Sequence, residues 1–339
     1  MDRGMVQLNT IQYYTPQPIF TPTQTFNIHI HQQQQTYVEK IKKLHKAAIN
    51  NKEQEVYKLI ADGVNVNAAA FKSLNTALHY ACIYNHLNIV KILSYKDANP
   101  NLKNHMGNTP LHCASYLGYL EIGKILINKY ANVNIVNNKN ETPFHFAVLS
   151  FIEYKENKQL KCKPIEFIKL LLHNDADTTV RNNQGNTAFQ IKNNQGNTAL
   201  HIAAFNGDVE MAQIIINDEY HNINNINIQN NNGETPLYFA TFSLTDSKKH
   251  ESSKKEQLIQ LIKLLLDKGA RTTIKNHENF RPDNQITLIV ADTPPNEQDA
   301  VSTKEERSFI NRAHTLLLCA KLESLALTEA IFPLKQSII

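Results

Sequence analysis

Tryptophan is absent from the 339-residue chain, and glycine occurs only ten times. No glycine-rich loop of the kind that cradles phosphate groups is present, and the signatures of serine hydrolases, zinc proteases and kinases are missing as well. Cysteine is equally scarce: its four copies lie far apart without a CxxC pair, which argues against a zinc site or a disulfide framework. We therefore expect no catalytic residues, no metal site and no cofactor.

Long apolar runs and a strong charge of one sign are also lacking. No run approaches the roughly 20 apolar residues that a membrane-spanning helix needs, and the N-terminus lacks the basic-then-apolar pattern of a secretory signal. The 35 basic and 31 acidic residues give a formal net charge of +4, too small to indicate nucleic-acid binding. We expect no membrane insertion, and nucleic acid only as an indirect or weak partner.

One short motif recurs along the chain. It begins as Asn-Thr-Ala-Leu-His at 75–79, and its threonine returns 33 residues later in the next copy. Between copies lies a second apolar run with helical spacing, such as Ile-Val-Lys-Ile-Leu at 89–93. Further copies of the motif, the first of them degenerate, stand at 44–48, 108–112, 141–145, 197–201 and 234–238.

This pattern resembles the ankyrin-repeat family, in which each repeat combines a β-turn finger with two helices. Threonine suits the N-cap of the first helix and proline its first position. Each helix pair has an apolar face that it cannot bury alone, so neighbouring repeats stack into a continuous core. The resemblance implies an all-α ankyrin-repeat solenoid of about six repeats with β-turn fingers, plus a helical C-terminal cap.

The repeats depart from the family pattern at several turns. Leu74 and Asn140 replace the glycine that suits a tight turn with positive φ, so we expect those two turns to be less regular. Asn104, Asn137 and Asn230 stand where the family usually has an aspartate. Asparagine can accept the same backbone hydrogen bonds without the charge.

The sequence divides into three segments. Residues 1–38 form an arm rich in Gln and Thr with no charged residue after position 3, read either as a disordered tail or as a docking arm. Residues 39–290 hold the repeats, with insertions near 151–164 and 244–257. Residues 291–339 are expected to be helical, either capping the solenoid or binding a partner.

An 11-residue duplication at 182–203 interrupts the array. Asn-Asn-Gln-Gly-Asn-Thr-Ala occurs at 182–188 and again at 193–199. Eleven residues are too few for a repeat, so we expect the second copy to start a helix and the first to form an enlarged finger loop. The duplication is read either as DNA slippage tolerated at a loop tip or as a selected feature.

The resemblance also implies where partners dock and which residues are structural. The motif histidines (His79, His112, His145 and His201) match a family histidine that bonds neighbouring repeats. Partners of the family bind the concave face formed by the first helices, and the finger tips. Carried over by motif, the expected concave residues are Ile83, Tyr84, Tyr116, Leu117, Leu149, Ser150, Phe205, Asn206, Phe242 and Ser243, and the finger-tip residues are Phe71, Lys72, His105, Met106 and Lys139.

The apolar and aromatic side chains at these concave positions predict a protein-binding strip, unless the insertions or the N-terminal arm cover it. Two basic clusters are read either as nuclear import signals or as solvated lysines. They comprise Lys40, Lys42, Lys43 and Lys46, and Lys248, Lys249, Lys254 and Lys255.

The string Leu-Asn-Thr-Ile-Gln at 8–12, the irregular repeats and the charge-free arm resemble AnkG-like ankyrin effectors that intracellular bacteria deliver by type IV secretion. That resemblance implies a monomer secreted into a host cell, acting in the host cytoplasm or the nucleus. There it would bind host proteins and modulate apoptosis or nuclear and transcriptional regulation. An intracellular scaffold of the producing organism and an RNA-associated regulator are the alternatives.

Overall fold

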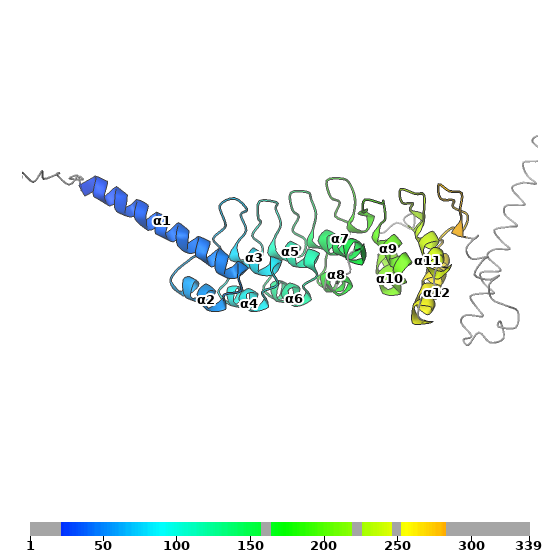
Figure 1. Ribbon diagram of the computed structural model, residues 1–339, viewed down its shortest axis with the longest axis horizontal. Helices are drawn as coiled ribbons and strands as arrows, with labels where there is room; N and C mark the ends of the chain where they lie inside the picture. The colour runs from blue at the N-terminus through cyan, green and yellow to red at the C-terminus, as the bar shows by residue number, and fades with distance from the viewer. Residues whose placement is uncertain (1–21, 157–163, 219–225, 246–251, 283–339) are drawn as a thin grey trace, which may run out of the picture.

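Twelve α-helices and one 3₁₀ turn stack along a single axis in the computed structural model (Figure 1), which describes residues 22–156, 164–218, 226–245 and 252–282. The described residues contain no β-strand, only an isolated bridge between Ala69 and Thr76, so the predicted all-α class is confirmed. Segments 1–21 and 283–339 lie outside the described residues, and with them the segment expected to cap the C-terminus.

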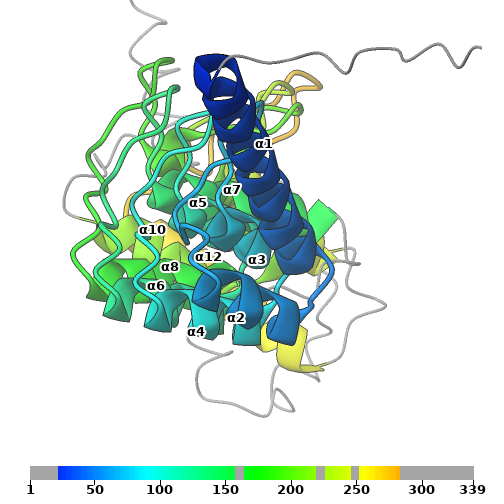
Figure 2. The ribbon, with the colours of Figure 1, turned by 90° about the vertical axis from the view of Figure 1, so that its left-hand side faces the viewer.

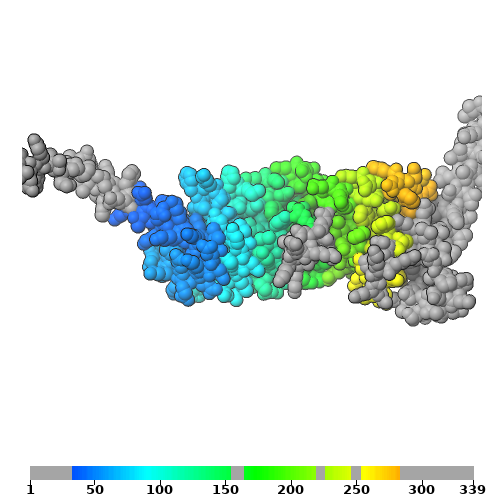
Figure 3. All heavy atoms as spheres, viewed as in Figure 1, coloured from blue at the N-terminus to red at the C-terminus, as the bar shows by residue number. Residues whose placement is uncertain are grey.

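The helices form two layers, with the fingers projecting from one edge (Figure 1). One layer contains α1 (Pro22–Ile49), α3 (Ala77–Ile83), α5 (Pro110–Leu117), α7 (Pro143–Glu156), α9 (Ala199–Asn206) and α11 (Pro236–Thr245). The other contains α2 (Glu53–Ala61), α4 (Leu87–Tyr95), α6 (Leu120–Asn128), α8 (Pro164–His173), α10 (Val209–Asn217) and α12 (Ser252–Asp267). Each helix of the first layer packs against its successor in the second, and the space-filling view shows one continuous body (Figure 3).

The core runs the length of this body, because each helix pair contributes apolar side chains to both neighbours. Its largest fully buried side chains include Phe144, Phe151 and Phe167, all from α7 and α8. Helices α6 and α8 approach closely where Gly123 faces the ring of Phe167: a Cβ at that glycine would lie 2.6 Å from the ring. This stacking buries the apolar faces as the repeat pattern predicts.

The recurring threonine and histidine form the start of each first helix. Thr109 N–H donates to Nδ1 of His112 at 3.1 Å, and the Thr109 hydroxyl lies 2.8 Å from the same nitrogen. The Nε2–H of His112 then donates to the carbonyl of Glu141 in the next repeat at 3.0 Å. The motif therefore caps a helix and joins two repeats with one imidazole.

The asparagines that replace aspartate form a second connection between repeats. Oδ1 of Asn137 accepts from the N–H groups of Lys139 and Glu141 at 2.8 and 2.9 Å, which confirms the expected turn bonds. Its Nδ2 also donates to Oδ1 of Asn108 in the preceding finger at 2.9 Å. A carboxylate could not donate that second bond, so the amide links two fingers where an aspartate would only close one turn.

The two turns without glycine behave differently from each other. Asn140 adopts φ = 60° and donates its N–H to the carbonyl of Asn137, as Gly107 does to Asn104, so the expectation of an irregular turn there is wrong. Asparagine tolerates the left-handed region better than most residues. Leu74 also has a positive φ of 53°, but its finger closes through a wider Ala70–Asn75 backbone bond. That turn is less regular, as expected.

The described part of the N-terminal arm is helical, and the two insertions adjoin helix ends. Helix α1 is continuous from Pro22 to Ile49, so the boundary placed at residue 38 falls inside it, and the helix extends beyond α2 and α3 (Figures 1 and 2). The first insertion lengthens α7 to Glu156, and residues 157–163 of it lie outside the described part. In the second insertion, 246–251 are likewise not described.

The duplicated copies fold in two ways. The second copy places Thr198 at the N-cap of α9. The first forms a finger of its own, where Asn182 Oδ1 accepts from Gln184 and Asn186, and then a single 3₁₀ turn, η1 (Ala188–Gln190). A complete finger is thus followed by one turn in place of a helix pair.

Because some turn asparagines donate a bond between fingers and others only accept bonds, we expect replacement by aspartate to destabilise the protein at the first kind of position and not at the second. Replacing Asn230 by Asp removes the Nδ2 bonds to Asn197 Oδ1 and Glu234 Oε2, both 2.8 Å, and places a carboxylate beside Glu234. We expect the free energy of unfolding at pH 7 to fall by about 2 kcal/mol, measured by urea denaturation.

The matched control for this substitution is Asn99→Asp. Asn99 Oδ1 accepts from the Asn101 N–H at 2.9 Å, and Asp177 already makes the equivalent bond to Thr179 at 2.9 Å. The control should change stability by no more than about 0.5 kcal/mol. Equal effects of the two substitutions would contradict the role given to Nδ2.

Candidate protein-binding surface

Four exposed rings follow the concave ends of the first-layer helices. Tyr84, Tyr116, Phe205 and Phe242 retain 50%, 39%, 42% and 45% of their accessible surface. They come from α3 or its C-cap, α5, α9 and α11, so four of the first-layer helices present them along the array, and α7 presents none. The exposed fractions include every described atom, so the described part of α1 does not cover these rings.

Neighbouring side chains hold Tyr116 in place near the middle of the array. Tyr116 packs edge-on against Phe146 of α7, with 6.1 Å between ring centroids. Its hydroxyl donates to Oε2 of Glu153 at 2.5 Å, and this hydrogen bond, with a smaller contribution from burial, raises the pKa of Tyr116 to about 12. The tyrosine is therefore a fixed, neutral contact at physiological pH.

The C-terminal half of the strip is built in the same way. Phe205 packs edge-on against Phe239 at 6.0 Å between centroids, and Phe242 stacks on Tyr238 at 6.2 Å with a 10° interplanar angle. Edge-on and offset-stacked rings are the favoured arrangements for aromatic pairs. A ring from the next repeat thus orients Phe205, and a ring from the same helix orients Phe242.

The other predicted concave residues contribute less. Ile83, Leu117, Leu149 and Asn206 are half-buried. Ser150 and Ser243 are buried, at 2% exposure each, so their prediction as groove residues is wrong. The reason is the insertions: α7 and α11 continue past the position where α3, α5 and α9 end, which turns both serines into the packed side of a helix.

The sequence reasoning missed the supporting rings Phe146, Tyr238 and Phe239, and also Glu153. Phe146 and Phe239 lie at the same place in the motif, directly after the position that holds His145 or Tyr238. An aromatic side chain there falls close to the exposed ring of the preceding repeat. No motif position could have indicated Glu153, because it lies in an insertion outside the repeat pattern.

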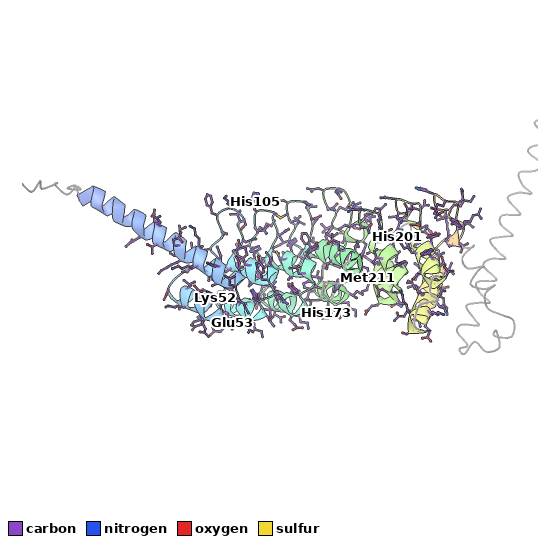
Figure 4. The ribbon with its side chains drawn as sticks, in the orientation of Figure 1. Lys52, Glu53, His105, His173, His201 and Met211 are labelled. Carbon is purple, nitrogen blue, oxygen red and sulfur yellow. The ribbon has the colours of Figure 1, made fainter. Side chains whose placement is uncertain are left out.

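The predicted finger-tip residues are all exposed. Phe71 retains 96% of its surface and Met106 retains 58%, while Lys72, His105 and Lys139 are exposed as well. Figure 4 shows His105 at the finger edge, and His173 at the opposite edge of the molecule. The fingers and the aromatic strip are therefore both accessible to a partner.

The basic clusters are only partly described. Lys42, Lys43 and Lys46 are exposed on α1, where Lys42 pairs with Glu39 at 2.6 Å, and Lys40 is half-buried. Lys255 is exposed and Lys254 half-buried at the start of α12, whereas Lys248 and Lys249 lie outside the described residues. Their use as import signals stays a prediction.

The motif histidines are buried and neutral rather than arranged as ligands. Burial lowers the pKa of His79, His112 and His201 to about 4, and lowers that of His145 as well. Nε2 of His145 forms no hydrogen bond within the described atoms, although the Asn186 carbonyl lies close enough to raise the pKa slightly. Within the described ranges, no group of three or more His, Cys, Asp or Glu could hold a metal ion.

Comparison with protein families gives one match, to a family described as ankyrin repeats in three copies, over residues 23–104, 95–182 and 160–276. The three overlapping stretches run through about three quarters of the chain. A comparison with curated proteins gives no match. Among the described helices, none is both long and apolar enough to cross a membrane.

The histidines predict loss of stability in acid. Because their folded pKa lies below the unfolded value of 6.5, the neutral form stabilises the fold above pH 6.5, and this contribution falls as the pH drops toward 4. The loss should reach roughly 3 kcal/mol for each such histidine at pH 4. Urea denaturation at pH 7, 5.5 and 4.5 measures it.

The contribution of one histidine to this acid sensitivity can be tested with His112→Gln. Glutamine fits the motif position, because Gln190 stands there in the first duplicated copy and accepts from the N–H of Thr187 at 3.1 Å. This variant should be less stable at pH 7 but should lose stability less steeply in acid. His105→Gln, on the exposed finger edge, is the control and should leave the slope unchanged. An unaltered slope in the His112 variant would refute the assignment.

Proposed function

Because the chain belongs to the ankyrin-repeat family, we propose that it is a non-catalytic protein-interaction module whose partner binds the concave aromatic strip formed by Tyr84, Tyr116, Phe205 and Phe242. The observation that carries this proposal is their exposure, 39–50% each, on four first-layer helices of the array. Exposed apolar side chains gathered on one face mark interaction sites in soluble proteins.

The strip has the properties of an energetic anchor. Tyrosine and phenylalanine bury a large area at low conformational cost, and the rings are already oriented by Phe146, Phe239 and Tyr238. A pre-organised surface loses little entropy on binding, which favours affinity. Phe71 and Met106 at the fingers extend the contact to a second edge of the same surface.

Replacing Tyr84, Tyr116 and Phe205 together by alanine should reduce partner capture at least tenfold, because each exposed ring can contribute more than about 1 kcal/mol. The measurement is quantitative mass spectrometry of proteins captured from host-cell lysate on the immobilised chain. The far-ultraviolet circular dichroism spectrum should stay unchanged, since the replaced rings are exposed.

The matched control replaces three exposed tyrosines of the second layer, Tyr57, Tyr95 and Tyr130, which retain 50%, 76% and 87% of their surface. This control removes as many aromatic rings without touching the strip and should leave capture intact. Equal capture by the wild type and the concave-face variant would reject the proposal.

For the cellular setting, we propose a bacterial effector that type IV secretion delivers into a host cell, where it binds host proteins in the cytoplasm or the nucleus and modulates apoptosis or transcription. The support is the resemblance at residues 8–12 and the irregular array. The composition of residues 323–339, which include Glu323, Glu329 and Leu334, fits a loose translocation signal.

A reporter enzyme fused to the N-terminus should appear in host cells infected with a secretion-competent strain, and removal of residues 323–339 should abolish its delivery. A strain without the secretion apparatus is the control. Reporter activity that never exceeds this control would favour an intracellular scaffold of the producing organism.

A further inference from the structure

A groove of about 630 Å³ lies between α8 and α10, on the layer away from the aromatic strip. Phe189 of η1 is among its lining residues, together with Leu172 and Ala176 on the α8 side and Ile214 on α10. Its volume is within the range of ligand sites. None of the residues of the proposed concave surface lines this groove.

The groove exists because the first duplicated copy is incomplete. Between α6 and α8, adjacent helices touch: Leu170 packs beside Gly123 so closely that a Cβ on the glycine would lie 3.2 Å from it. Ile214 holds the place in α10 that Leu170 holds in α8. The finger at 182–186 and η1 stand between the two repeats without a second-layer helix of their own, so Ile214 faces the groove instead of a neighbouring helix.

The floor of the groove is apolar and firmly packed. Phe189 is 3% exposed, and its ring meets Phe144 edge-on with 5.3 Å between centroids. Leu172 and Ile214 are half-buried on the two walls. A large apolar side chain placed here would contact the Phe189 ring at the floor and cover Leu172 and Ile214, which a complete repeat would have buried.

The rim is polar and carries more negative than positive charge. Lys169 of α8 pairs with Glu210 of α10 across the groove, and also lies 3.7 Å from Glu166. Further along, the Thr178 hydroxyl donates to Oδ1 of Asp218 at 3.1 Å. Among the described residues that line the groove, Lys169 is the one cation, whereas Glu210 and Asp218 both carry negative charge.

We propose that this groove binds a short peptide segment of a partner protein, in which one large apolar side chain covers Phe189 and an adjacent lysine or arginine pairs with Asp218 and Glu210. The basic residue complements the negative charge of the rim, and the apolar side chain packs against the apolar floor. Exposed Glu210, Gln213 and Asn217 leave the groove open along α10, as an extended peptide requires. The site is independent of the aromatic strip.

Deleting residues 182–192 gives a sharp test, because residues 193–199 repeat the first seven of the eleven residues removed. The remaining finger can then take the place of the finger at 182–186, which bonds to Lys139 through Asn183 at 2.9 Å. Helices α8 and α10 should close together. A displayed library of random 12-residue peptides is selected on the full chain, with counter-selection on the deletion chain.

The selected peptides should share a large apolar residue beside lysine or arginine, and should lose at least tenfold in affinity on the deletion chain by fluorescence anisotropy. The double variant Glu210→Gln with Asp218→Asn, made in the full chain, should lose about tenfold. Glu121→Gln, at the equivalent place in α6, is the control. Selected peptides without a basic residue, or none that prefer the full chain, would overturn the proposal, and the double variant decides if the deletion chain does not fold.

Discussion

The bond from a motif histidine to a carbonyl of the next repeat sets the spacing of the repeats that it joins, and it occurs at His79, His112 and His201. One imidazole accepts from the capping threonine and donates 29 residues further on, from His79 to Asn108 and from His112 to Glu141. This fixes both where a helix begins and how far away the next finger stands. An imidazole can accept one hydrogen bond and donate another only while it is neutral. The stability of the fold therefore depends on pH.

The aromatic strip follows from that spacing. Since each first helix begins at the same point relative to its neighbours, residues at its far end form a line, and side chains as unlike as Tyr84 and Phe242 become parts of one surface. Phe146 and Phe239 occupy one motif position and support the preceding ring in each case. Regular backbone connections thus give a continuous surface whose chemistry each repeat can vary.

Much of this could be predicted from the sequence. The threonine caps and the helix pairs follow from motif and period, and the resemblance to the ankyrin-repeat family gives the exposed rings. Ser150 and Ser243 could not be placed correctly, because the insertions decide whether a helix stops before them or continues. The donor bonds of Asn137 and Asn230 were missed for a different reason: they depend on what the preceding finger presents, which the turn pattern does not show. The α8–α10 groove could not be predicted, because it depends on the relative positions of α8, η1 and α10.

The incomplete unit at 182–192 also weakens the energetic coupling between the repeats on its two sides. In a solenoid, cooperativity is transmitted only through contacts between neighbouring repeats. Here the second-layer contact is replaced by a groove and the Nε2 atom of His145 lacks its bond, so the coupling across this step is weaker than elsewhere. We therefore expect the step between α8 and α9 to be where the array separates first, with the block from α9 to α12 opening at a lower free energy than the block from α1 to α8.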